Sequence, residues 1–504
     1  MTTVPSSTGP HARSSDVIPP AVATALEVRT TGAARRWRVM LALLAVAAAM
    51  PAAAAAHQYT ADLRQVSGPS PFAGGCPGTA FDSTMITGQE LEPSITVNPA
   101  NPRNILGTWK QDVGPDSTRS DLVASSLDAG RTWRRSTIPG LSKCTGGTAD
   151  GGSDPWVSAG LDGTVYFSGL APHFQGSTPL NAVVVSRSRD GGRTWRMPVT
   201  ISPPDHEGNE MPAITASPRH PQRAYVVWAD FATAGIEFST TTNRGATWSA
   251  PVVVDPSIPD AIDLVPRLVV LPSGTLVTIF ARAEFAIGLG KIYAARSRDG
   301  GASWTAPVEI LAAPLAGFSD PETGEELPQP QFENVAVAPD GSVYVTVESN
   351  TSPSAGTVSV SRSRDEGASW TQVTSPGVGA YAFEPAIAVD SHGTVGITWY
   401  DLRNDRPGDS ALSADVWFAS SRDGGWSWQQ THVAGPTDLR TGALPRQNHV
   451  GEYQGLAAMG HRGFAAIFTL AAPFATDGPT DIFVARIKRD GCRHNHGCPH
   501  RKDR

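Results

Sequence analysis

The chain has 504 residues, a formal net charge of −7 and only 17% charged residues. A hydrophobic fraction of 40% with 13 tryptophans is enough for a large core and excludes wholesale disorder. The weak, net acidic charge argues against a partner such as nucleic acid, because neutralising a polyanion requires a clustered basic surface. With 50 glycines and 42 prolines, the turn-rich composition favours an all-β fold.

The N-terminal region predicts export. Residues 39–56 form the one long apolar run, three arginines (Arg35, Arg36 and Arg38) precede it, and small residues at its end suit cleavage before His57. This order is typical of a secretory signal peptide. A membrane anchor is the alternative, but the alanine-rich end is weakly apolar for a span. We expect residues 1–56 to be a leader and signal peptide, and the protein to be secreted without a stable membrane span.

The four cysteines predict disulfides, since an even number in an oxidising compartment is usually paired. The simplest of three pairings joins Cys76 to Cys144 and Cys492 to Cys498. Residues 492–500 also contain three histidines, so zinc binding is the alternative for this segment. We expect oxidised thiols here, and we interpret residues 488–504 as a basic Cys/His-rich tail.

An internal repeat predicts the architecture. The pattern Ser-x-Asp-x-Gly-x-Thr/Ser-Trp, here called the repeat turn, follows an alternating apolar run each time, which places it in a β-hairpin. Its Asp can accept hydrogen bonds from turn amides, its Gly suits a positive φ, and its Trp is expected to pack into the core. The tryptophans are 53 to 66 residues apart, the spacing of a repeat protein. Five copies begin at Ser126, Ser188, Ser297, Ser363 and Ser421, and a sixth, from Thr241, has Asn243 in place of the aspartate.

A second repeat indicates the number of structural units. Seven short apolar strands begin close to a carboxylate, and the last unit supplies only three strands. Residues 59–66 are expected to supply the missing outer strand and so to close a ring. Residues 57–487 are therefore predicted to form one seven-bladed β-propeller of four-stranded blades, with six blades as the alternative.

The repeat turns resemble the Asp-box, or BNR, repeats of sialidases and related propeller glycosidases. The segments Glu384-Pro-Ala-Ile, Trp399-Tyr-Asp-Leu-Arg and Gly451-Glu-Tyr-Gln-Gly-Leu resemble those of secreted bacterial sialidase-like proteins. The resemblance implies a secreted exo-glycosidase that acts on glycans at the channel mouth. The family's Phe/Tyr-Arg-Ile-Pro motif is absent, since the first strand reads Glu92-Pro-Ser-Ile.

The candidate site residues follow the ends of the inner strands, where carboxylates and aromatic rings meet as sugar chemistry requires. The carboxylates near the first strands are Glu92, Asp154, Glu210, Asp263, Glu333, Glu384 and Glu452. The resemblance implies a tyrosine nucleophile, for which Tyr453 is the candidate, with Glu384 or Glu452 as proton acceptor and Asp112 or Asp401 as general acid. Substrate binding is assigned to Arg267, Arg403, Arg446, Trp399 and Tyr400.

Two other functions remain open. One is a non-catalytic propeller that binds glycan or protein, and the other is a polysaccharide lyase that would use His449 near Tyr453. No cofactor is expected, although an acidic ring would also suit Ca²⁺. We expect a carbohydrate ligand and a monomer.

Overall fold

The structure is a computed structural model in which the chain divides into Met1–Ala56 and His57–Arg504. It describes residues 59–489 apart from 116, 177, 203–205, 256–259, 285–288, 315–317, 325, 328–332, 353–354, 378–380 and 443–449. The predicted leader and the Cys492–Cys498 pair lie outside the described residues. The last strand runs to Arg489, two residues beyond the boundary expected for the propeller.

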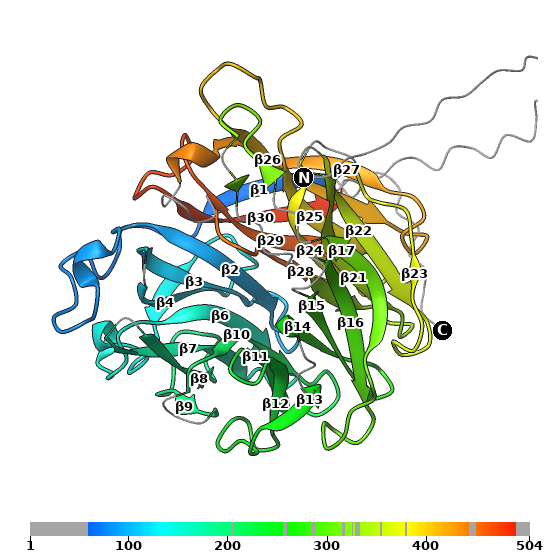
Figure 1. The fold of residues 1–504 in the computed structure, drawn as a ribbon, viewed down its shortest axis with the longest axis horizontal. Helices are drawn as coiled ribbons and strands as arrows, with labels where there is room; N and C mark the ends of the chain where they lie inside the picture. The colour runs from blue at the N-terminus through cyan, green and yellow to red at the C-terminus, as the bar shows by residue number, and fades with distance from the viewer. Residues whose placement is uncertain are drawn as a thin grey trace, which may run out of the picture. The chain divides into compact units, whose positions relative to one another are not determined.

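Seven four-stranded antiparallel sheets, the blades, stand in a ring and form a seven-bladed β-propeller (Figure 1). Blades 1 to 3 are β2(Glu90–Val97), β3(Ile105–Val113), β4(Thr118–Ser126), β5(Arg134–Thr137); β6(Ser153–Ala159), β7(Val165–Gln175), β8(Thr178–Ser188), β9(Val199–Thr200); and β10(Asn209–Ala216), β11(Ala224–Asp230), β12(Gly235–Thr241), β13(Val252–Asp255). Blades 4 to 6 are β14(Ala261–Val270), β15(Leu276–Glu284), β16(Leu289–Ser297), β17(Val308–Pro314); β20(Asn334–Val337), β21(Val343–Ser352), β22(Ala355–Ser363), β23(Thr371–Gln372); and β24(Phe383–Val389), β25(Val395–Asp401), β26(Ser413–Ser421), β27(Gln429–Asp438). A small hairpin, β18(Phe318–Ser319) and β19(Glu326–Leu327), lies between blades 4 and 5 in the chain.

Blade 7 closes the ring with both ends of the described chain. It contains β28(Gly455–Ala458), β29(Phe464–Leu470), β30(Asp481–Arg489) and, as its outer strand, β1(Tyr59–Gln65). β1 pairs antiparallel with β30 from Tyr59↔Arg489 to Gln65↔Phe483, and the two lie side by side in Figure 1. The predicted closing strand is confirmed, and the ring has seven blades rather than six.

The innermost strands share a bulge that a proline marks. Five residues that precede proline have a positive φ of 49° to 57°, and the pairing register with the second strand shifts at each of them. An L-residue rarely adopts this conformation, which tends to persist at functional sites because the surrounding structure holds it. The bulge turns the side chain out of the regular alternation of the strand. The five residues are Glu92, Asp154, Met211, Val265 and Glu384.

The cores lie between neighbouring blades. Seven hydrophobic clusters pack across the seven junctions of the ring, so that each blade buries both of its faces. The tryptophans of the repeat turns lie at the edges of these clusters. Trp195 is 7% exposed, but Trp133 and the other four are only half-buried, which differs from the fully packed position expected of them.

The repeat turns show why their residues recur. Asp128 accepts hydrogen bonds from the amides of Arg131 and Thr132 at 2.9 Å, and the Ser126 hydroxyl accepts one from the amide of Gly130 at 2.8 Å. Gly130 has a φ of 79°, which glycine adopts without steric cost.

Among the described residues the helices are 3-10 turns of three residues, and none could cross a membrane.

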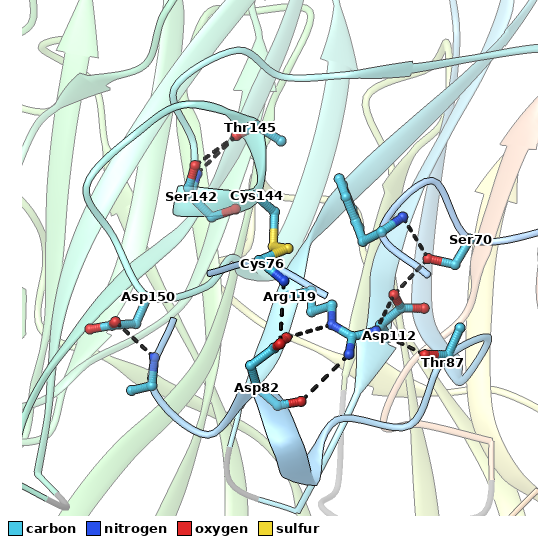
Figure 2. Close-up of a disulfide and its surroundings, with 12 residues drawn as sticks. Ser70, Cys76, Asp82, Thr87, Asp112, Arg119, Ser142, Cys144, Thr145 and Asp150 are labelled. Carbon is cyan, nitrogen blue, oxygen red and sulfur yellow. Dashed lines mark hydrogen bonds and ion pairs between the residues drawn. A yellow bond between two sulfur atoms is a disulfide. The ribbon is translucent and has the colours of Figure 1, made fainter. Parts of the chain in front are cut away.

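A disulfide ties the segment before blade 1 to the connection between blades 1 and 2. Cys76 is bonded to Cys144, as predicted, and η3(Lys143–Thr145) carries the second cysteine (Figure 2). Asp82 accepts a hydrogen bond from the Cys76 amide and pairs with Arg119, which ties the same segment to β4. The disulfide and this ion pair fix residues 66–89 over blade 1.

Candidate functional site

Six residues from four blades meet where the inner strands begin, and we name them the central cluster. Glu92 and Lys110 come from blade 1, Asp154 and Trp156 from blade 2, Arg267 from blade 4, and Tyr453 from the residues just before β28. The bulges place Glu92 and Asp154 side by side, since the two carboxylates share one cation. The chain therefore uses strained inner-strand residues to bring its charged groups together.

Lys110 is the cation that holds the two carboxylates. Its Nζ lies 2.6 Å from Glu92 and 3.0 Å from Asp154, and its side chain is 14% exposed. Asp154 also accepts hydrogen bonds from the Ser153 hydroxyl at 2.8 Å and from the Met211 amide at 3.0 Å. Burial opposes the ionisation of Asp154, but Lys110 and these hydrogen bonds outweigh it and lower its pKa. Burial raises the pKa of Glu92, although Lys110 opposes the shift.

Tyr453 connects the aromatic and the acidic parts of the cluster. Its hydroxyl hydrogen-bonds the Glu92 carboxyl, while its ring lies 5.6 Å from that of Trp156. The guanidinium of Arg267 stands over both rings, at 4.2 Å from Trp156 and 5.7 Å from Tyr453. Burial raises the pKa of Tyr453 well above its usual range, and Glu92 and Asp154 add to the shift. The tyrosine is therefore neutral and needs a base to become a nucleophile.

Burial raises the pKa values of further carboxyl groups around the cluster. Burial raises the pKa of Glu452 to about 8, to which Glu92 contributes, and burial also raises that of Glu333 to about 8. Glu384 is 4% exposed, and neither of its oxygens has a hydrogen-bond partner among the described residues. Burial raises its pKa well above the usual range, and Glu348 adds to the shift. The site thus offers an ionised carboxylate, Asp154, beside proton donors.

A cavity of about 210 Å³ runs along the centre of the ring beside the cluster. Its lining includes at least one inner-strand residue from each of the seven blades, and Trp156 and Arg267 belong both to this lining and to the cluster. Ser94, Ser158 and Thr215 add hydroxyl groups to the lining. An aromatic ring, a guanidinium and hydroxyls around a narrow cavity are groups that suit a sugar.

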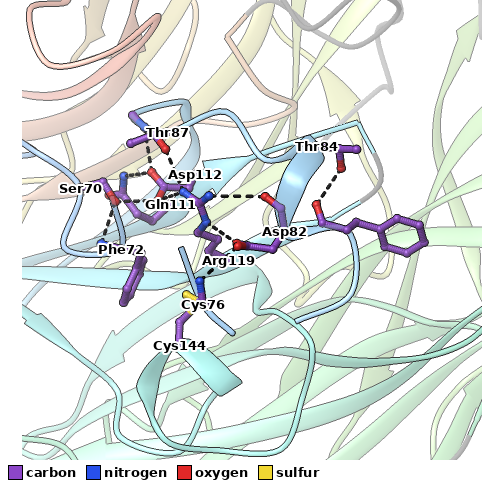
Figure 3. A network of polar contacts seen from close by, with 12 residues as sticks. Ser70, Phe72, Cys76, Asp82, Thr84, Thr87, Gln111, Asp112, Arg119 and Cys144 are labelled. Carbon is purple, nitrogen blue, oxygen red and sulfur yellow. Dashed lines mark hydrogen bonds and ion pairs between the residues drawn. A yellow bond between two sulfur atoms is a disulfide. The ribbon is translucent and has the colours of Figure 1, made fainter. Parts of the chain in front are cut away.

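Of the residues predicted to be functional, Tyr453 and Arg267 lie in the central cluster and Glu384 lies in its acidic surroundings. Asp112 lies elsewhere, at the end of β3, where the Gly88 amide, Ser70, Gln111 and Arg119 all donate hydrogen bonds to it (Figure 3). Its side chain is fully buried, and it ties the segment before blade 1 to the β3–β4 hairpin. Its oxygens are therefore occupied by structural contacts.

The predicted residues of blade 6 also make structural contacts. Asp401 accepts hydrogen bonds from Trp399 Nε1 at 2.9 Å and from Arg403 Nη2 at 2.6 Å, and Arg403 lies 4.0 Å over the ring of Trp417. Tyr400 is stacked on Phe383 and donates a hydrogen bond to the Thr469 carbonyl at 2.8 Å. Arg446 and His449 lie outside the described residues.

The sequence marked some of the remaining site residues and missed others. Glu92, Asp154, Glu210 and Glu452 belong to the carboxylates that the strand repeat singled out, but the sequence did not identify Glu92 as the partner of Tyr453. Trp156 follows Asp154-Pro, so its place beside the bulge could have indicated it. No sequence pattern indicated Asp121 of β4 as a site residue. Its side chain is buried, and burial raises its pKa well above the usual range.

The described residues contain no group of three or more His, Cys, Asp or Glu that could hold a metal ion. The carboxylates of the central cluster are instead compensated by Lys110 and Arg267. The structure thus provides no described site for the Ca²⁺ that the acidic ring suggested.

Comparisons with known proteins give likenesses of fold at low identity. No family model and no curated protein matches the chain. A protein of unknown function from Dyadobacter fermentans is 14% identical, with a TM-score of 0.44 over 85% of this chain and 99% of that one. The Hadza microbial sialidase Hz136 is 14% identical (TM-score 0.42; 80% and 66% covered). The intramolecular trans-sialidase from Ruminococcus gnavus is 13% identical (TM-score 0.42; 65% and 92% covered).

Proposed function

We propose that this protein is a glycoside hydrolase of the sialidase-like type whose reaction centre is the central cluster. The observation that carries the proposal is the hydrogen bond of the Tyr453 hydroxyl to Glu92, beside the ionised Asp154 and the guanidinium of Arg267. Sialidases use a tyrosine nucleophile, and a tyrosine paired with a carboxylate has the base that this chemistry needs.

In the proposed reaction the Tyr453 oxygen attacks the anomeric carbon as Glu92 takes its proton. The bond from that carbon to the leaving oxygen breaks, and Glu452, whose pKa of about 8 keeps it protonated at neutral pH, gives that oxygen a proton. Water then attacks the glycosyl-tyrosine, with Glu452 now accepting its proton, and Tyr453 recovers its hydrogen from Glu92. Lys110 favours the ionised form of Glu92, the form that can act as the base.

Substrate binding in this proposal rests on Trp156 and Arg267. The ring of Trp156 offers an apolar face to a sugar, and Arg267 is the predicted arginine that lies in the cluster and can receive a carboxylate. Arg403 is paired with Asp401. Arg267 is the one described arginine among the many carboxyl groups of the cluster. Binding of an acidic sugar would therefore depend on Arg267, whereas binding of a neutral sugar would not.

Export belongs to the same proposal. The Cys76–Cys144 disulfide supports it, because such bonds persist in oxidising compartments. The predicted signal peptide supports it independently. The substrate would then be a glycan outside the cell.

Hydrolysis of fluorogenic aryl glycosides tests the proposal. The substrates are one sialoside and a panel of neutral glycosides, and the proteins compared are wild type, Tyr453→Phe and Tyr400→Phe. Tyr453→Phe is expected to lose turnover, and Tyr400→Phe, a buried tyrosine outside the cluster, to keep it. A fluorinated glycoside should leave its mass on the peptide that contains Tyr453. If Tyr453→Phe keeps full turnover, the tyrosine is not the nucleophile. If wild type cleaves no glycoside but binds glycans on an array, the protein is a binding propeller instead.

A further inference from the structure

The end of the propeller opposite the central cluster carries arginine. In each blade, the turn from the first to the second strand and the repeat turn lie at the same end of the antiparallel strands, which we call the turn face. The residue before the repeat-turn aspartate is an exposed arginine in four of the copies, Arg189, Arg298, Arg364 and Arg422. The net charge of −7 averages over this basic face and the acidic cluster at the other end.

One pocket on the turn face lies between blades 5 and 6. It has a volume of about 440 Å³, and its lining includes Arg362, Arg364, Arg422, His392 and Tyr344. Arg362 lies 5.2 Å over the Tyr344 ring and donates a hydrogen bond to Ser342 at 2.8 Å. Asp340 and Asp423 also line the pocket.

A second pocket has the same chemistry at another junction. It lies between blades 3 and 4, has a volume of about 510 Å³, and is lined by Arg219, Arg223, Arg298, His220 and Tyr225. Its carboxylates are those of Asp299 and Glu366. Three arginines, a histidine, a tyrosine and two carboxylates thus recur in both pockets, although the residues come from different blades.

Three of the six guanidinium groups, those of Arg223, Arg364 and Arg422, have no ion pair or hydrogen bond among the described residues, whereas Arg219 donates a hydrogen bond to the Pro272 carbonyl. Among the described residues, the ion pairs of the two pockets are Arg362 with Asp340 at 3.5 Å and Arg298 with Glu366 at 2.9 Å. Arg364 and Arg422 are exposed and take part in neither pair. The repeat-turn aspartates are occupied by their own turns, since Asp423 accepts hydrogen bonds from the amides of Trp426 and Ser427.

The chemistry of the lining favours a charged sugar polymer. Trp426, in the repeat turn that lines the first pocket, is 52% exposed, whereas the other copies have arginine or alanine at this position. An exposed aromatic ring beside arginines suits a sugar that carries an anionic group. The carboxylates in both pockets can accept hydrogen bonds from the hydroxyl groups that a polysaccharide carries along its chain and that the phosphate backbone of DNA lacks.

We propose that the turn face binds an acidic polysaccharide, through these two junction pockets, by its carboxylate or sulfate groups. This site is separate from the proposed reaction centre and does not depend on it. Its two pockets hold two segments of one chain or of neighbouring chains. Binding would keep the protein on an anionic glycan layer while the opposite end stays free.

Binding of the full chain to polygalacturonate, to heparin and to neutral dextran tests the proposal, with single-stranded DNA as the competing polyanion. The pocket variants are Arg364→Ala/Arg422→Ala and Arg223→Ala/Arg298→Ala. The matched control is Arg189→Ala/Arg193→Ala, which removes two exposed arginines from the blade 2 repeat turn outside both pockets. Each pocket variant is expected to weaken binding to the acidic polymers at least about tenfold, because charge-assisted hydrogen bonds are lost. The control is expected to change it less than about twofold, and thermal melting checks that every variant is folded.

Trp426→Ala separates stacking from charge. It is expected to weaken binding about fivefold while the dependence of affinity on salt stays unchanged, since no ion pair is lost. Polygalacturonate and heparin distinguish carboxylate from sulfate as the recognised group, and binding to either supports the proposal. Absence of binding to both at low salt would overturn it. Equal losses in the pocket variants and the control, or DNA bound as tightly as the polysaccharides, would also overturn it.

Discussion

The Tyr453 hydroxyl hydrogen-bonds the Glu92 carboxyl, and this contact joins the first residues of blade 7 to the bulged inner strand of blade 1. Both side chains are more than nine-tenths buried. Glu92 also forms the short ion pair with Lys110. One carboxyl group therefore serves both the proposed nucleophile and the charge balance of the site.

Lys110→Met should destabilise the protein in a pH-dependent way. The change leaves Glu92 and Asp154 buried without their cation, and breaking a buried pair in this manner costs about 3–5 kcal/mol. Denaturant unfolding at pH 7 should show the larger loss, because at pH 5 the carboxyls can take up protons instead. The double variant Lys110→Met/Glu92→Gln should regain part of the loss; equal losses at both pH values would contradict the argument.

The buried acids should make the folded protein less stable as the pH rises. The pKa of Glu333 is about 8 in the folded protein and ordinarily near 4.5, so folding favours its protonated form. Its contribution is fully present below about pH 4.5 and is lost as the pH rises through about 8, up to roughly 5 kcal/mol. Glu333→Gln should flatten the dependence of the melting temperature on pH between 5 and 9. Glu207→Gln, an exposed carboxyl, is the control and should leave the dependence unchanged.

The fold could be predicted from the sequence because its signals are local and repeated. Each repeat turn is fixed by hydrogen bonds within eight residues, and their spacing gave the blades and the place of the closing strand. The site was less predictable, since its pairs join distant blades. The ion pair of Lys110 with Asp154 illustrates this limit, because β3 of blade 1 supplies the cation and β6 of blade 2 supplies the carboxylate.

Burial predicts that the repeat-turn tryptophans differ in their importance for stability. Trp195 is 7% exposed and packs against Phe167, so Trp195→Ala should cost about 3–5 kcal/mol. Trp133 is half-buried, and Trp133→Ala should cost clearly less than that. Chemical denaturation of the two variants measures the difference. Equal costs would show that exposure is a poor guide to packing in these turns.

Loss of the Cys76–Cys144 disulfide should lower stability without changing the fold. The bond closes a segment with a sequence separation of 68, and the chain-entropy argument gives roughly 4 kcal/mol for a loop of this length. Cys76→Ser/Cys144→Ser should therefore melt at a lower temperature than wild type. The Asp82–Arg119 ion pair remains in the variant and should keep the segment in place. An unchanged melting temperature would mean that the unfolded chain is not constrained by the bond.

Glu452 should determine the alkaline limit of catalysis if it is the proton donor. Its pKa of about 8 predicts that kcat/KM falls as the pH rises above 8, because the carboxyl then loses the proton that the leaving group needs. Glu452→Gln should lose about 10²–10⁴ in rate on a substrate with a poor leaving group. On a dinitrophenyl glycoside, whose leaving group needs no proton, the variant should keep most of its rate in the glycosylation step. Glu384→Gln, which removes another buried acid near the cluster, is the control and should lose no more rate on one substrate than on the other. An alkaline limit that persists unchanged in Glu452→Gln would assign the proton transfer to a different group.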